Sequence, residues 1–151
     1  MISSVGTTRI PAFDAAAMRR AREARGWSQG RLAAELDLAV ITIYSWERGT
    51  QAPEPPTFVL LAAALDLQPG ELLDTGSDRW TLTELRVVSG IHQQTAAANA
   101  DVRPNRLSQI EAGYERLREP LRSRLAALYN VTEEVIDQAW EQGRQRLMTE
   151  T

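Results

Sequence analysis

Arginine is the residue type through which this chain could bind a ligand most strongly. All 17 of its basic residues are arginine and none is lysine. The planar guanidinium group bonds phosphate, a carboxylate or a base edge through two N–H groups at once. Six arginines fall between Arg103 and Arg124, where only three acidic residues accompany them. Any phosphate or guanine contact that this chain makes must therefore come from arginine, and the basic surface belongs mainly to this segment.

Catalytic and metal chemistry find little support in the residues. The chain has no cysteine, and His92 is its single histidine. There is no glycine-rich loop that could cradle a phosphate, no nucleophile paired with a base and no set of metal ligands. We therefore expect no enzyme activity, no metal and no cofactor.

The composition is that of a globular protein with 43% hydrophobic and 25% charged residues. No apolar run approaches the roughly 18 residues that span a membrane, and Met1–Gly6 lacks the basic start and apolar core of a signal peptide. These features predict a cytoplasmic protein without a membrane partner. The net charge of -3 argues against nucleic acid as a ligand, because nucleic-acid-binding domains are usually basic.

An internal repeat organises the chain. One offset of 64 residues aligns Met18–Leu72 with Leu82–Ile136 without a gap. Because each copy is large enough to be a small domain, the repeat predicts two domains at 12–74 and 80–148, joined by a linker at 75–79. The identical pairs include Arg22/Arg86, Gly26/Gly90, Gln29/Gln93, Ala33/Ala97, Ala34/Ala98, Asp37/Asp101, Glu47/Glu111, Gly49/Gly113, Pro56/Pro120 and Leu61/Leu125.

Helical spacing of apolar residues predicts that each copy is built from five helices. In the first copy, Asp14 and Ser28 are suited to cap the first two helices, and the third runs from Val40 to Arg48. Pro56 and Pro69 suit the first turns of the fourth and fifth helices. In the second copy the expected helices are 82–89, 93–100, 104–112, 119–129 and 133–147. The apolar stripe of the last helix could pack on its own domain, and its extra turns could equally meet a second chain.

Three sequence features occur together in the first copy: Ser28-Gln29 at a helix start, Trp46-Glu47-Arg48-Gly49 at a helix end, and Leu-Ala-x-Ala-Leu-x-Leu from Leu61. With these features the chain closely resembles the Xre/Cro (lambda-repressor-like) helix-turn-helix family, over about 15–73 and, more divergently, 81–136. The resemblance implies an all-α fold of two tandem five-helix helix-turn-helix domains. It also implies that Trp27 and Trp46 lie in the core.

The resemblance implies that the third helix of each copy reads DNA in the major groove. The base-contacting residues would be Val40, Ile41, Thr42, Tyr44 and Ser45 in the first copy and Asn105, Arg106 and Gln109 in the second. Asparagine and glutamine can bond adenine through two atoms, and arginine can bond guanine, whereas valine and isoleucine offer only apolar contact, at best with thymine methyl groups. An exposed apolar pair is also typical of a protein interface, and the polar face of the second copy could be an ordinary solvated surface.

Two further sets of roles follow from the resemblance. The phosphate contacts would come from Gln29, Gln93, Arg48, Thr50, Arg116 and Arg118. The structural ion pairs would be Arg22 with Glu47 and Arg86 with Glu111, tying the first helix to the third. As an alternative to phosphate binding, Arg116 and Arg118 could be solvated or pair with Glu115 and Glu119.

These expectations favour a sequence-specific DNA-binding transcriptional regulator, a repressor, with double-stranded DNA as its partner. Because the two reading surfaces differ, we expect a division of labour between the copies, with more polar base contacts from the second. The alternative is a protein-interaction module, antitoxin-like or anti-repressor-like, in which one copy has become a protein interface. A homodimer or a protein partner fits either hypothesis.

Overall fold

The computed structural model describes residues 12–150, and these residues are helical throughout, apart from their connections. Within this range there is no β-strand, only an isolated antiparallel bridge between Phe13 and Leu73. The all-α prediction is therefore confirmed. The prediction for Met1–Gly6 concerns residues outside the described range. The chain divides into two compact units, Met1–Gly76 and Ser77–Thr151, which we call unit 1 and unit 2.

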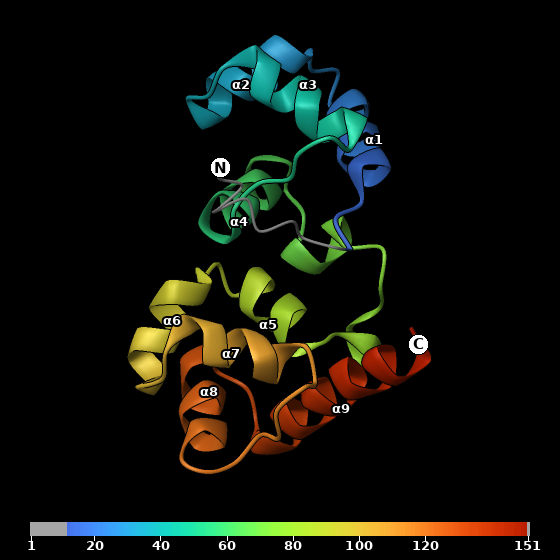
Figure 1. Cartoon of the computed structure of the whole chain (residues 1–151). Helices are drawn as coiled ribbons and strands as arrows, with labels where there is room; N and C mark the ends of the chain where they lie inside the picture. Colours follow the sequence, from blue (N-terminus) through green and yellow to red (C-terminus); the bar gives the residue numbers. More distant parts are fainter. Residues whose placement is uncertain (1–11, 151) are drawn as a thin grey trace. The chain divides into compact units, whose positions relative to one another are not determined.

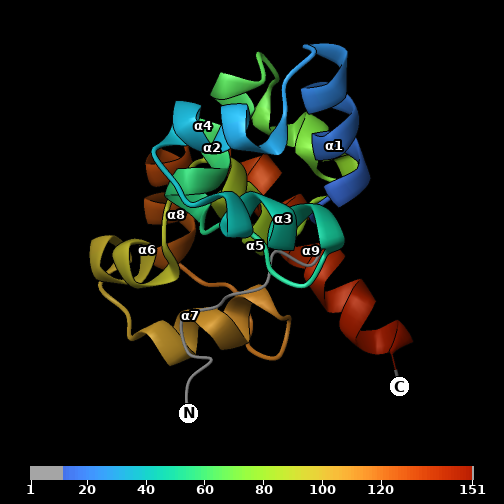
Figure 2. The same cartoon turned by 90° about the horizontal axis from the view of Figure 1, so that it is seen from above.

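Unit 1 contains four α-helices and one short 3-10 helix (Figure 1). In both views α1 lies beside α3, against which it packs (Figure 2). The elements are α1 (Ala15–Ala24), α2 (Gln29–Leu36), α3 (Val40–Arg48), α4 (Pro55–Ala64) and η1 (Pro69–Leu72).

The helix limits of unit 1 follow from local backbone chemistry. The Asp14 carboxylate accepts the Ala17 N–H at 3.0 Å, and the Ser28 hydroxyl accepts the Arg31 N–H at 3.0 Å, which confirms both predicted caps. Gly49 ends α3 with a φ of 76°, in the left-handed region that favours glycine. The fourth helix begins at Pro55, with Pro56 in its first turn as predicted, and the fifth is a single turn of 3-10 helix that begins at Pro69.

The core of unit 1 joins all of these elements. Fully buried side chains come from each α-helix and from η1: Met18, Leu32, Ile43, Phe58, Leu61 and Leu72. The Asp14 N–H donates to the Leu72 carbonyl at 2.8 Å, and the Asp74 N–H donates to the Ala12 carbonyl at 2.8 Å. These bonds tie the segment before α1 to the end of the unit, so that the core is closed at this edge.

Unit 2 begins within the predicted linker, where Ser77–Arg79 forms a 3-10 turn, η2. Thr81 and Glu84 then form a capping box at the start of the next helix. The α-helices are α5 (Leu82–Val88), α6 (Gln93–Ala100), α7 (Pro104–Glu111), α8 (Leu121–Tyr129) and α9 (Glu133–Thr149). The predicted 119–129 helix thus starts two residues later than expected, after Pro120.

The long helix α9 packs on its own unit. It contacts α5, α7 and α8 (Figure 1), with Ile136 and Ala139 buried in the core of the unit. Its extra turns do the same: the guanidinium of Arg146 bonds both carboxylate oxygens of Glu84 at 3.1 and 3.2 Å. Of the two alternatives for these turns, the structure therefore shows packing on the same unit.

Candidate nucleic-acid interface

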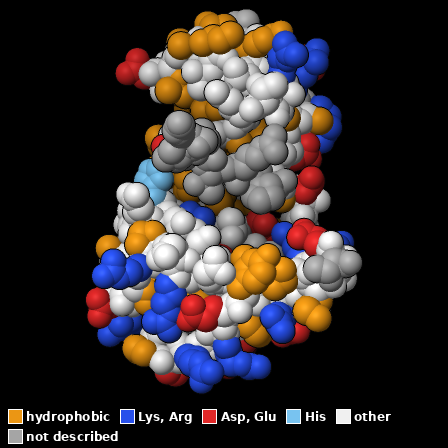
Figure 3. Space-filling view, viewed as in Figure 1, with side chains coloured by type: hydrophobic (Ala, Val, Ile, Leu, Met, Phe, Trp, Pro, Cys, Tyr) orange, Lys and Arg blue, Asp and Glu red, His pale blue; other side chains and the backbone are white. Residues whose placement is uncertain are grey.

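The exposed face of α3 is apolar. Ile43 and Trp46 point into the core of unit 1, and this places Val40, Ile41 and Tyr44 outward with 49%, 64% and 42% of their surface exposed. Thr42 and Ser45 are half-buried. Figure 3 shows apolar side chains gathered over the α2 and α3 end of unit 1. The predicted base-contacting set of the first copy thus divides into three exposed and two partly covered residues.

The residues after this face are engaged in local contacts. The Arg48 Nη1 donates to the Tyr44 hydroxyl at 2.9 Å, and the guanidinium lies 5.4 Å from the centre of the Tyr44 ring. The Thr50 hydroxyl donates to the Ser45 carbonyl at 3.1 Å. Both predicted phosphate ligands, Arg48 and Thr50, are exposed, so these bonds can exchange with another acceptor.

An ion pair braces α3 from inside unit 1. Arg22 donates from Nε to Glu47 Oε2 at 2.6 Å and from Nη2 to Oε1 at 3.0 Å, while its Nη1 donates to the Trp27 carbonyl at 2.7 Å. The Gln29 amide nitrogen donates to Glu47 Oε1 at 3.1 Å. Burial raises the pKa of the Glu47 carboxyl, but the hydrogen bonds from Arg22 and Gln29 outweigh burial and hold this pKa below its ordinary value. One of the two N–H groups of the Gln29 amide, which is predicted to meet phosphate, is therefore bonded to Glu47.

Helix α7 carries the polar face that the sequence predicts. Leu107 and Ile110 are buried, and Pro104, Asn105, Arg106 and Gln109 are exposed. Among residues 12–150, no hydrogen bond involves the side-chain amides of Asn105 and Gln109. Arg106 donates from Nε to Glu115 Oε2 at 2.7 Å, in an exposed ion pair. Two free amides and one exposed guanidinium thus share one helix face.

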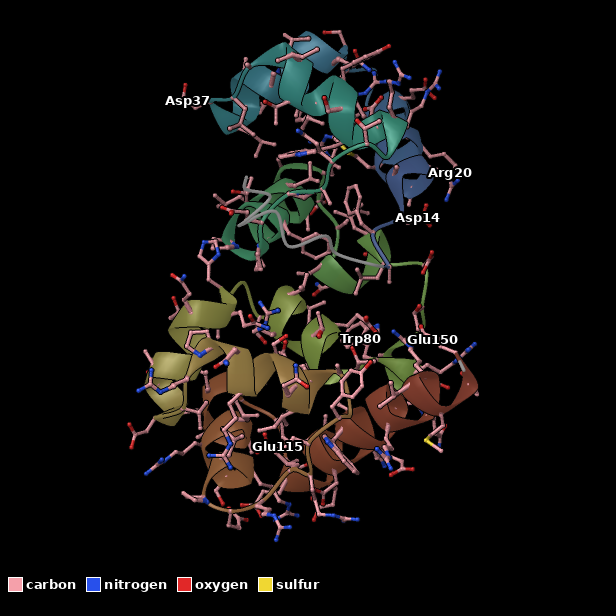
Figure 4. All side chains as sticks on the ribbon, viewed as in Figure 1. Asp14, Arg20, Asp37, Trp80, Glu115 and Glu150 are labelled. Carbon is pink, nitrogen blue, oxygen red and sulfur yellow. The ribbon has the colours of Figure 1, made fainter. Side chains whose placement is uncertain are left out.

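The loop after α7 is held by α9. Trp140 Nε1 donates to the Glu115 carbonyl at 3.0 Å, and Arg144 Nη1 donates to the Gly113 carbonyl at 3.0 Å. The Arg116 guanidinium lies 5.7 Å from the centre of the Trp140 ring, and Figure 4 shows Glu115 in this loop, between α7 and α8. The suggested pairing of Arg116 and Arg118 with neighbouring glutamates is wrong, because Glu115 binds Arg106 and Glu119 binds Arg122.

The ion pair of unit 2 repeats the geometry of unit 1 at deeper burial. Arg86 donates from Nε to Glu111 Oε2 at 2.8 Å and from Nη1 to the Ile91 carbonyl at 3.0 Å. The Gln93 amide donates to Glu111 Oε1 at 2.9 Å. The side chains of Arg86 and Glu111 expose only 1% and 3% of their surface. Arg86, Ile91, Gln93 and Glu111 each lie 64 residues after their equivalents in unit 1.

The comparison with protein families matches one part of the chain. Residues 18–72 match the helix-turn-helix family model. This segment runs from α1 to η1 and includes the Arg22–Glu47 pair and the whole of α3. The match indicates DNA binding in transcription regulation. No curated protein and no solved structure is similar enough to the chain to count as a match.

Among residues 12–150, no group of three or more histidine, cysteine, aspartate or glutamate side chains could hold a metal ion. None of the helices in that range is long and apolar enough to cross a bilayer.

One tryptophan that was predicted to lie in the core is partly exposed. Trp46 is buried as predicted, but Trp27 is only half-buried, and two arginine side chains rest on its ring. The signal was present in the sequence as Arg25 and Arg31 on either side of the tryptophan.

Proposed function

We propose that this chain is a sequence-specific DNA-binding transcription regulator, a repressor, that reads DNA through α3 and α7. The observation that carries the proposal is the equivalent hydrogen-bond network that holds each of these two helices in its unit. In each unit an arginine of the first helix and a glutamine of the second converge on the glutamate of the third. The segment matched to the helix-turn-helix family contains one of these networks, and the second supports a helix-turn-helix role for unit 2.

The two reading helices would do different work. On α7, the free amides of Asn105 and Gln109 suit adenine, and Arg106 suits guanine once it leaves Glu115. On α3, Val40 and Ile41 can offer only apolar contact. Because the two surfaces differ, a single chain bound alone would require an asymmetric DNA site. Phosphate contacts by Arg48, Arg116 and Arg118 would make the affinity fall with salt concentration.

A second candidate function is a protein interface on α3. The observation that favours it is the exposure of Val40, Ile41 and Tyr44, with no charged side chain on α3 before Glu47. Contiguous exposed apolar side chains mark interaction sites on soluble proteins. In that case unit 2 alone would hold DNA, and unit 1 would bind a second protein or a second copy of this chain.

Two double variants separate these functions. The assay is equilibrium binding of the full chain to a DNA site selected from random sequence. Each two-atom contact to a base contributes about 1–3 kcal/mol of discrimination, so Asn105→Ala with Gln109→Ala should weaken binding by at least about tenfold and relax base preference. Gln145→Ala, an exposed glutamine on α9, is the matched control and should bind as the unchanged chain does.

The complementary variant places charge on the apolar face, as Val40→Asp with Ile41→Asp. If only this change reduces DNA binding, α3 is the reader and the role given to α7 is wrong. If it leaves DNA binding intact but abolishes self-association or partner capture, the protein-interface function of α3 is supported. Failure to select any DNA site would overturn the proposed function itself.

A further inference from the structure

The guanidinium groups of Arg25 and Arg31 both lie against the ring of Trp27, where α1 connects to α2. The Arg25 guanidinium carbon lies 4.4 Å from the centre of the Trp27 ring, and that of Arg31 lies 4.8 Å from it. Arginine stacked on an aromatic face keeps its in-plane N–H groups free to bond an anion. The half-buried tryptophan therefore acts as a platform that presents two guanidinium groups together.

These two charges are not balanced by the carboxylates around them. Among residues 12–150 Arg25 has no carboxylate partner, and Arg31 pairs only with Glu35, in an exposed i,i+4 contact of 3.0 Å. Such a pair is worth only a few tenths of a kcal/mol and exchanges readily. The other nearby carboxylates are taken, because Glu23 binds Arg19 and Glu47 binds Arg22.

Two like charges against one ring favour the binding of an anion to them. Each guanidinium lies within 5 Å of the same ring centre, so their separation is comparable to the screening length of about 8 Å at physiological ionic strength. Their repulsion is therefore only partly screened, and a bound anion would relieve it. The N-terminal end of α2, directly between them in sequence, adds positive potential from its free N–H groups.

The same corner is where the resemblance places a phosphate contact by Gln29. In the structure the Gln29 amide N–H is donated to Glu47 at 3.1 Å. That bond uses one of the two N–H groups of the amide, and Arg25 and Arg31 add further side-chain donors at this corner. Unit 2 has no such cluster, because the residues 64 positions later are Ser89, Ile91 and Thr95.

We infer that Arg25 and Arg31, with Trp27 as their positioning residue, form a phosphate-binding surface that holds unit 1 on the DNA backbone. This inference rests on the proposed function. It explains how unit 1, which has Arg48 at the end of α3 and no arginine in the loop that follows, can be anchored without the arginines that unit 2 carries after α7. The ligand is the backbone phosphodiester, so this contact contributes affinity and orientation but no base preference.

The test is the salt dependence of DNA binding by the full chain. Each phosphate contact contributes about 0.9 to the slope of log affinity against log salt concentration. The double change Arg25→Gln with Arg31→Gln should lower that slope by about 2 and leave the selected base sequence unchanged. The control, Arg19→Gln with Arg20→Gln, removes the same net charge from exposed positions of α1 and should leave the slope unchanged.

Trp27 is tested separately, because its role is to position the arginines. Trp27→Leu removes the aromatic platform and should weaken DNA binding several-fold, and Trp27→Phe, which keeps an aromatic face, should restore most of the affinity. Equal affinity of the leucine and phenylalanine variants would overturn the role of Trp27.

The outcomes distinguish this inference from the proposed function. If the unchanged chain binds a selected site and the Arg25/Arg31 variant keeps the full salt slope, the phosphate surface is refuted while the DNA-binding function stands. An equal loss of slope in the Arg19/Arg20 control would show a general charge effect and would also refute it. If the unchanged chain binds no DNA, both proposals fall.

Discussion

Replacing Gly113 with alanine should destabilise unit 2 more than the same change at Gly49 destabilises unit 1. Both glycines end the third helix of their unit with a left-handed φ, 87° at Gly113 and 76° at Gly49. A Cβ atom at Gly49 would have nothing within 4 Å, whereas a Cβ at Gly113 would lie 2.7 Å from the Arg144 Cα of α9. Comparing the two glycine-to-alanine variants therefore separates the cost of backbone strain from the cost of the steric contact with α9.

The magnitudes follow from these distances. Left-handed backbone costs an L-residue about 1–2 kcal/mol, and this is the whole effect expected at Gly49. Overpacking against a neighbour that is itself backbone adds about 1–3 kcal/mol at Gly113, so that its total is about 2–5 kcal/mol. The free energies of opening are measured by native-state hydrogen exchange in the full chain, on peptides from 15–72 and from 82–149. Equal losses in the two variants would refute the close contact between α9 and the end of α7.

Two other predictions concern single groups. Because the pKa of Glu47 is lowered in the folded unit, its ion pair stabilises unit 1 above pH 4.5, the ordinary pKa of the carboxyl, and this contribution is lost as the pH falls below that value. Glu47→Gln should therefore reduce the fall in the urea midpoint of unfolding between about pH 7 and about pH 3. An unchanged fall would contradict the lowered pKa of Glu47. The hydroxyl of Tyr129 is buried without a hydrogen-bond partner among residues 12–150, so Tyr129→Phe should raise the stability of unit 2 by about 1 kcal/mol; a lower urea midpoint would show that this hydroxyl is hydrogen-bonded.

The parts of the fold that local chemistry controls could be predicted from the sequence. The limits of α3 and α6 agree with the predicted ranges, because a left-handed residue follows each helix and a short turn precedes it. The caps by Asp14 and Ser28 were predictable because each depends on residues within one turn.

The parts that depend on distant partners were not predictable. Arg106 pairs with Glu115, nine residues away, and Arg116 lies against the ring of Trp140. Both contacts depend on how the loop after α7 folds back onto α9. Trp27 was expected in the core, but the two arginines that flank it hold part of its ring at the surface. The free amides on α7 could be placed on an exposed face from helical spacing alone, whereas the occupied amide of Gln29 could not.

We propose that α3 and α7 present different reading surfaces to DNA. The most direct test is a footprint of the full chain on a selected DNA site, combined with the mass of the complex in solution, which counts the chains bound. For one bound chain we expect an asymmetric site whose two halves differ in sequence, with the polar base contacts in the half that depends on Asn105 and Gln109. A perfect palindrome bound by a single chain would contradict it.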